Sequence, residues 1–159
     1  MNNNIRKLVD DNWDEIKELI AQKAEAEQKT KTIWDLDTED SEEYYYICSD
    51  GDICWADFNS RYAQDTRDMG VAFLTREKAN FEAERRRVEA ILRKYSKPFK
   101  LNEGNYVIKH NVTFKMVEIG LFATTDYGIP YFESEEIAKK AINEIGEDRL
   151  IKYWFKDTE

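Results

Sequence analysis

Residues 44–58 read YYYICSDGDICWADF, and this stretch decides the fold class. Two runs rich in aromatic and β-branched residues, 44–48 and 53–58, lie on either side of Asp50-Gly51. Such residues favour strands, and glycine accepts the positive φ that a tight turn demands. The stretch therefore predicts a β-hairpin with Asp50-Gly51 at its turn.

The predicted hairpin carries both cysteines of the chain, Cys48 and Cys54. A two-residue turn places Cys48 opposite Ile53 and Cys54 opposite Ile47, so the two thiols are expected on opposite faces, where they cannot form a disulfide. Their spacing is not C-x-x-C and signals neither a zinc site nor a redox motif. We therefore expect two reduced thiols, as is usual in the cytosol.

Helix signals follow the hairpin after a polar loop over residues 59–68. Thr75 can cap a helix that runs from Arg76 to about Tyr95, and Pro98 marks a stop just beyond it. Glu77 in the first turn suits the positive end of the helix dipole. The expected apolar face consists of Ala79, Ala83, Val88, Ile91, Leu92 and Tyr95.

The last third of the chain repeats this order. Residues 106–109 and 112–122 are predicted strands around a turn at His110-Asn111, Ser134 caps a helix over 135–145, and Gly146 suits its C-terminal end. A short helix or strand over 149–155 is expected to follow.

The two helix starts share the pattern Phe-x-Ser/Thr-x-Glu-x-Ala, beginning at Phe73 and at Phe132. Duplication of a unit, over 44–97 and 104–155, is one interpretation, and a good helix start after a strand is the other. Either way the sequence predicts an α+β fold in which two hairpin-plus-helix units form an antiparallel sheet with helices on one face.

Residues 1–32 are predicted to form an amphipathic helix that precedes the α+β domain at 44–159. The helix packs on its own domain, or it is an element of homo-oligomerisation or partner binding, because its spacing approaches a coiled-coil seam. Residues 33–43 are interpreted as an acidic linker. The apolar stripe of the helix consists of Ile5, Leu8, Val9, Trp13, Ile16, Leu19 and Ile20.

Composition limits the classes of protein that fit. A chain of 159 residues with 42% hydrophobic residues can build one ordinary domain, and a net charge of -9 favours basic partners over nucleic acid. No apolar run approaches the roughly 20 residues of a membrane span, and residues 1–10 do not resemble a signal peptide. We expect a protein of the cytoplasm, with no membrane contact.

Patterns typical of catalysis are absent from the sequence. His110 is the only histidine, and neither a nucleophile elbow nor a phosphate-binding glycine loop occurs. The many carboxylates include no pair that the sequence selects, and Asp50-Gly51-Asp52 fits a turn better than a calcium loop. We expect no enzyme activity, no metal and no cofactor.

Two charged surfaces remain as candidate binding sites. No Lys or Arg occurs between Ile33 and Ser60, so carboxylates and aromatic residues in this stretch could occupy a basic groove meant for nucleic acid; the alternative is a solvated loop. The candidate residues of this acidic surface are Asp35, Asp37, Glu39, Asp40, Glu42 and Glu43.

The alternative surface is basic. Residues 76–100 carry nine basic and four acidic side chains, a local net charge of +5, and clustered cations on a helix bind nucleic acid by releasing counterions. The other interpretation is an exposed helix face balanced by intrahelical glutamates. The candidate residues are Arg85, Arg86, Arg87, Arg93 and Lys94.

These motifs together resemble small accessory proteins of phages and prophages from low-GC Gram-positive bacteria, over about Tyr44 to Phe155. The resemblance implies no catalytic residues. It implies a protein made in the host cytosol that inhibits a host defence complex, such as a nuclease, by stoichiometric binding, as anti-CRISPR proteins do. A nucleic-acid-binding accessory protein is the alternative. The resemblance is carried by Tyr45-Tyr46-Ile47 with Asp50-Gly51-Asp52-Ile53, Gly70-x-x-Phe73-x-Thr75-x-Glu77-x-Ala79, Tyr131-Phe132-x-Ser134-Glu135-Glu136-x-Ala138, and Ile145-Gly146-Glu147-Asp148.

Overall fold

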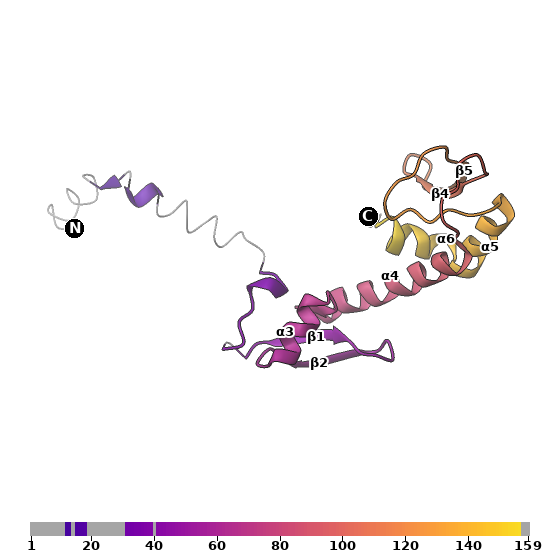
Figure 1. Ribbon diagram of the computed structural model, residues 1–159. Coiled ribbons are helices and arrows are strands. Elements are labelled where there is room, and N and C mark those ends of the chain that lie inside the picture. The colour runs from indigo at the N-terminus through magenta and orange to yellow at the C-terminus, as the bar shows by residue number, and fades with distance from the viewer. Residues whose placement is uncertain (1–11, 14, 19–30, 40, 157–159) are drawn as a thin grey trace.

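A computed structural model describes residues 12, 13, 15–18, 31–39 and 41–156 of the chain. It has an α+β fold, which confirms the predicted class (Figure 1). The elements are η1 (Ile33–Asp35), β1 (Glu43–Ile47), β2 (Ile53–Asp57), α3 (Arg61–Asp68), β3 (Ala72–Phe73), α4 (Arg76–Tyr95), β4 (Tyr106–Asn111), β5 (Met116–Leu121), α5 (Glu135–Ile145), α6 (Glu147–Arg149) and η2 (Leu150–Trp154).

Most of the predicted N-terminal helix lies outside the described residues. Within it, Trp13 and residues 15–18 are helical, and Ile16 N–H donates to the Asn12 carbonyl at 3.0 Å. The acidic segment that follows begins with the 3-10 turn η1 and contributes Leu36 to the core, where it is 4% exposed.

The hairpin β1–β2 is present, but its turn is longer than predicted. Ile47 pairs with Ile53, Cys48 N–H donates to the Asp52 carbonyl at 2.8 Å, and three residues, 49–51, form the loop. Gly51 has φ +87°, the left-handed conformation that ends such a three-residue turn.

The longer turn overturns the prediction for the cysteines. It shifts the register by one residue, so Cys54 lies opposite Tyr46 and shares a face with Cys48, which is two residues from Tyr46 on the same strand. Cys48 and Cys54 form a disulfide with a Cα–Cα distance of 6.1 Å. The prediction of two free thiols on opposite faces is therefore wrong, because it assumed a two-residue turn.

The first unit consists of a three-stranded antiparallel sheet in the order β2-β1-β3 with the helix α3. Its core contains Tyr44 and Phe58, which meet edge to face at 5.4 Å, and Ala63 of α3. Residues 59–68 were predicted to be loop. Ser60 instead caps α3 by accepting a hydrogen bond from Ala63 N–H at 3.4 Å.

Helix α4 runs from the first unit to the second (Figure 1). Thr75 Oγ1 accepts a hydrogen bond from Lys78 N–H at 3.3 Å, which confirms the predicted cap. The predicted apolar face is also confirmed, since Ala79, Ala83, Val88 and Leu92 are buried. Its first half packs on the β1 sheet, and its second half contributes to the core of the second unit.

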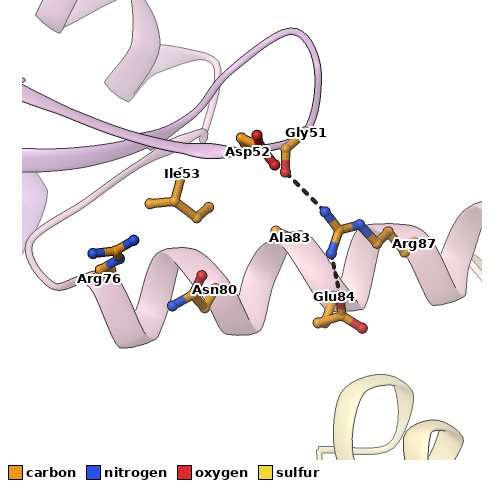
Figure 2. Close-up of a pocket in the computed structure, with 8 residues that line it drawn as sticks. All are labelled: Gly51, Asp52, Ile53, Arg76, Asn80, Ala83, Glu84 and Arg87. Atoms are coloured by element: carbon orange, nitrogen blue, oxygen red, sulfur yellow. Dashed lines mark hydrogen bonds and ion pairs between the residues drawn. The ribbon is translucent and has the colours of Figure 1, made fainter.

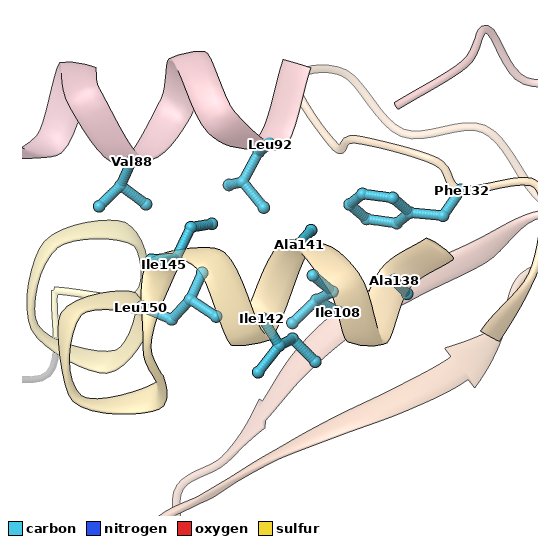
Figure 3. Packing of buried hydrophobic residues seen from close by; sticks show 9 residues of the cluster. All are labelled: Val88, Leu92, Ile108, Phe132, Ala138, Ala141, Ile142, Ile145 and Leu150. Carbon is cyan, nitrogen blue, oxygen red and sulfur yellow. The ribbon is translucent and has the colours of Figure 1, made fainter. Parts of the chain in front are cut away.

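The second unit contains the hairpin β4–β5, the predicted helix α5 and the C-terminal helical segment α6–η2. His110 lies inside β4 opposite Val117, so the predicted turn at His110-Asn111 is wrong, and residues 112–115 make the turn instead. Figure 3 shows this core, in which Val88 and Leu92 of α4 face the α5 residues Ala141 and Ile145.

The two hairpins form two separate sheets, not the single sheet that was predicted. They lie at opposite ends of α4, because the 20-residue helix spans roughly 30 Å and carries the second hairpin away from the first (Figure 1).

Both units nevertheless repeat one topology. Phe73 pairs antiparallel with Tyr45 of β1, Phe132 pairs antiparallel with Tyr106 of β4, and each phenylalanine is followed two residues later by the cap of a helix. Common descent of the two units stays a prediction.

Candidate acidic and aromatic binding surface

The residues of the predicted acidic surface do not gather at one point. Asp35 accepts hydrogen bonds from Thr32 N–H at 2.8 Å and Thr32 Oγ1 at 2.7 Å, and so stabilises the 3-10 turn. Asp37 accepts from Thr38 Oγ1 at 3.3 Å and Glu39 N–H at 3.4 Å. Asp40 lies outside the described residues.

The other two acidic residues belong to the edge of the hairpin. Glu42 forms an ion pair with Lys31, which partly neutralises it. Glu43 is exposed at the start of β1 and accepts a hydrogen bond from the Tyr45 hydroxyl at 3.2 Å. This hydrogen bond is the main reason why the pKa of Tyr45 is raised.

The antiparallel register adds Asp57, which belongs to the predicted acidic stretch but not to its six candidate site residues. Asp57 lies directly opposite Glu43, and Trp55 lies directly opposite Tyr45. Directly opposed residues share a face of the sheet, and so do residues two apart on a strand. Glu43, Tyr45, Trp55 and Asp57 therefore form one surface, named here the acidic-aromatic patch.

Two physical features of the acidic-aromatic patch are unfavourable for the isolated protein. Glu43 and Asp57 place like charges opposite each other, a destabilising arrangement, and no ion pair to either carboxylate occurs among the residues that the structure describes. Trp55 is also 67% exposed to solvent, although indole is among the larger apolar side chains.

Other exposed aromatic residues in the first unit already have partners. The Arg67 guanidinium lies 5.2 Å from the ring centre of Trp34, and Tyr62 meets Tyr46 edge to face at 5.8 Å. Tyr44 is fully buried, and burial is the main cause of its raised pKa. Trp55 has no ring contact of either kind within the described part of the chain.

The basic residues on α4 are paired with carboxylates. Arg85 bonds Glu82 at 2.6 Å and Glu89 at 3.1 Å, Arg86 bonds Glu82 at 3.3 Å, and Lys94 bonds Glu144 at 2.8 Å. Arg87 pairs with Glu84, and Arg93 pairs with Glu89. Each of the five residues of the alternative surface therefore has at least one carboxylate partner.

The pKa values of the carboxylates in this network follow from these contacts. The Arg87 hydrogen bond, with a further bond from Arg149 at 2.8 Å, lowers the pKa of Glu84. Burial acts to raise the pKa of Glu82, but the bonds from Arg85 and Arg86 outweigh it and the pKa is lowered. These glutamates stay ionised at neutral pH, so the network is charged throughout.

A groove of about 560 Å³ separates the hairpin tip from α4. Figure 2 shows Ile53 pointing towards α4 between Arg76 and Asn80 on the helix and the tip residues Gly51 and Asp52. Arg87 spans it, donating to the Gly51 carbonyl at 3.1 Å and pairing with Glu84. Both contacts are within the protein, so Arg87 holds the hairpin tip against α4 and is not free to bind a ligand in the groove.

The described residues contain no cluster of His, Cys, Asp and Glu that could hold a metal ion. The ring of His110 packs on Phe155 at 5.4 Å between centroids. Among the helices in the described ranges, none has the length and apolar character that crossing a membrane requires.

No family model, curated protein or solved structure matches this chain.

Proposed function

We propose that the protein works by stoichiometric binding to a basic surface of another protein, as a phage-encoded inhibitor of a host defence complex in the host cytosol. The acidic-aromatic patch is the centre of this binding surface. The resemblance of the sequence to phage accessory proteins is the basis for proposing a defence complex as the target. The charges and the exposed Trp55 of the patch are the basis for proposing a basic partner surface.

One observation carries the proposal: the carboxylates of Glu43 and Asp57, which form no ion pair with the described residues, oppose each other beside an exposed Trp55. A Lys or Arg of a partner that docks between the two carboxylates removes their repulsion. A tryptophan buried at the same time is the type of residue that contributes most to protein interfaces. Charge complementarity would also speed the encounter with a basic partner.

Nucleic-acid binding by α4 is disfavoured by the ion pairs that its arginines make. A phosphate would have to compete with Glu82, Glu84 and Glu89, each of which pairs with at least one arginine of the helix. The net charge of -9 opposes the approach of a polyanion as well.

The test is affinity capture from a host lysate, treated with nuclease, using four forms of the chain. Wild type is compared with Glu43→Gln/Asp57→Asn, with Trp55→Ala, and with the control Glu133→Gln/Asp148→Asn, which removes two exposed carboxylates in the second unit. We expect wild type and control to capture one protein partner in stoichiometric amount. The two patch variants should capture at least tenfold less of this partner.

Salt and nuclease separate the outcomes. Binding through the patch weakens as salt increases, and the Gln/Asn variant has a shallower salt dependence because it has fewer charges to screen. Retention of the partner by both patch variants would contradict the proposal. Capture of nucleic acid that nuclease removes would favour the basic helix instead.

A further inference from the structure

The second unit contains a mostly apolar groove of about 430 Å³. It lies beside β4 and is closed by Phe122, by Ile129 and Pro130, and by Trp154 and Phe155 at the C-terminal end of the helical segment. This groove is remote in sequence from the acidic-aromatic patch and has the opposite charge.

One wall of the groove is an edge of β4. Tyr106 uses this edge to exchange two backbone hydrogen bonds with Phe132, at 3.0 and 2.8 Å. Because alternate residues of a strand direct their N–H and C=O groups to the same side, Ile108 directs its backbone groups to this edge as well. No backbone hydrogen bond to Ile108 on this side occurs in the described ranges. Its side chain is committed to the core (Figure 3).

The first unit shows what occupies the equivalent position there. Next to the Tyr45–Phe73 pair, Ile47 N–H donates to the Val71 carbonyl at 3.1 Å. Val71 therefore covers the edge of β1 at this position. In the second unit the same antiparallel register, continued from the Tyr106–Phe132 pair, would set Pro130 opposite Ile108. Proline has no N–H to donate to β4. The groove lies between β4 and this part of the chain, Ile129 and Pro130.

The side chains around the groove restrict the chemistry of an occupant. Among the described residues that line the groove, Lys109 has a formal charge and none is a carboxylate. Its ammonium lies 4.7 Å from the ring centre of Phe122, and no ion pair to it is present among the described residues. The groove therefore suits apolar side chains together with one anionic group.

We propose that this groove binds an extended segment of a partner protein, which adds a strand to this edge of β4. The segment exchanges backbone hydrogen bonds with Ile108, inserts apolar side chains between Phe122 and Trp154, and sets an Asp or Glu on Lys109. Strand addition to an exposed edge is a general mode of peptide recognition. The inference is independent of the proposed function, because it uses another surface and an acidic partner.

The test begins with a random library of displayed 12-residue peptides selected on the full chain. We expect enriched peptides in which apolar residues alternate with polar ones and which contain Asp or Glu. Binding of such a peptide should slow amide exchange of Ile108 by at least tenfold. N-methylation of the peptide amides facing β4 should abolish binding, whereas N-methylation of the alternate amides should not.

A charge reversal provides the matched control. Lys109→Glu should lower affinity for the acidic peptide at least tenfold and raise affinity for its Glu→Lys counterpart, while Lys140→Glu, an exposed position on α5, should leave both affinities unchanged. The proposal is overturned if no peptide is enriched, if bound peptides leave Ile108 exchange unchanged, or if the free protein dimerises and protects Ile108, which would make a second copy the occupant.

Discussion

At the scale of single residues, the pair Glu43 and Asp57 places a local cost in the hairpin. Each carboxylate lies at the exposed end of a strand. An arrangement that lowers the stability of the free protein fits a role in binding, since binding sites commonly retain groups that are unfavourable until a partner covers them.

We predict that Glu43→Gln/Asp57→Asn stabilises the free protein by about 0.5 kcal/mol, because like charges opposite each other in a sheet destabilise by that order. Urea unfolding at neutral pH and low salt measures the change. The gain should shrink at high salt, where the repulsion is screened. A loss of stability would indicate that the two carboxylates have favourable partners.

The disulfide is the second feature at this scale. It closes a short loop, with a sequence separation of 6 between Cys48 and Cys54. Alkylation of the denatured, oxidised protein should add no label, and alkylation after reduction should add two. Cys48→Ser/Cys54→Ser should lower the free energy of unfolding of the oxidised protein by about 2 kcal/mol, because a short closed loop restricts the unfolded chain only modestly. Labelling of both thiols without reduction would contradict the disulfide.

At the scale of elements, α4 joins the parts of the molecule through charged contacts. Arg87 reaches the hairpin tip at Gly51, and Glu84 pairs with both Arg87 and Arg149 of α6. The charges that suggested a phosphate-binding surface therefore connect the helix to the hairpin on one side and to the C-terminal segment on the other.

This network predicts a loss of stability in acid. The folded pKa of Glu84 is lowered by Arg87, so the unfolded chain binds the proton more readily. The contribution of ionised Glu84 to the free energy of unfolding is full above the unfolded glutamate pKa of about 4.3. It is lost as pH falls through the lowered folded pKa. Glu84→Gln should reduce stability at pH 7 by about 0.5 kcal/mol and flatten the decline below pH 4, measured by urea unfolding across pH. Glu133→Gln should change neither.

The elements that could be predicted from the sequence are those with local signals. The caps at Thr75 and Ser134 and the apolar spacing of α4 each depend on residues within a few positions of one another. Helix α3 was missed because its eight residues have only two buried positions, Ala63 and Thr66, too few for a visible periodicity. The two sheets could not be separated in advance, since strand pairing depends on distant residues.

The candidate site was predictable only in composition. The sequence showed that cations are absent from residues 33–60, and the structure confirms that Glu43 is exposed. Which carboxylates face each other depends on whether the turn has two or three residues, and this difference of one residue moves every side chain of β2 to the other face. The same shift of register explains why Asp57 lies opposite Glu43 and why Cys48 and Cys54 can form a disulfide.

At the scale of the whole molecule, the described residues form two hydrophobic clusters, and α4 contributes Val88 and Leu92 to the second of them. Phe58 belongs to the cluster of the first unit and Leu92 to that of the second, and the two clusters share no residue. Helix α4 nevertheless buries Ala79 and Ala83 towards the first sheet and Val88 and Leu92 in the second core. Helix α4 is therefore an element through which damage to one core can affect the other.

We predict that Leu92→Ala and Phe58→Ala have different spatial effects on amide hydrogen exchange. Leu92 is 1% exposed and Phe58 is fully buried, so each truncation should cost about 3 to 4 kcal/mol by leaving a cavity. Leu92→Ala should accelerate exchange most in β4 and α5, and Phe58→Ala most in β1 and β2, with the second half of α4 affected only by the former. The matched control is Leu101→Ala, a residue 76% exposed, which should leave exchange unchanged. If either core variant instead accelerates exchange equally in both sheets, the two clusters unfold as one cooperative unit and α4 couples them completely.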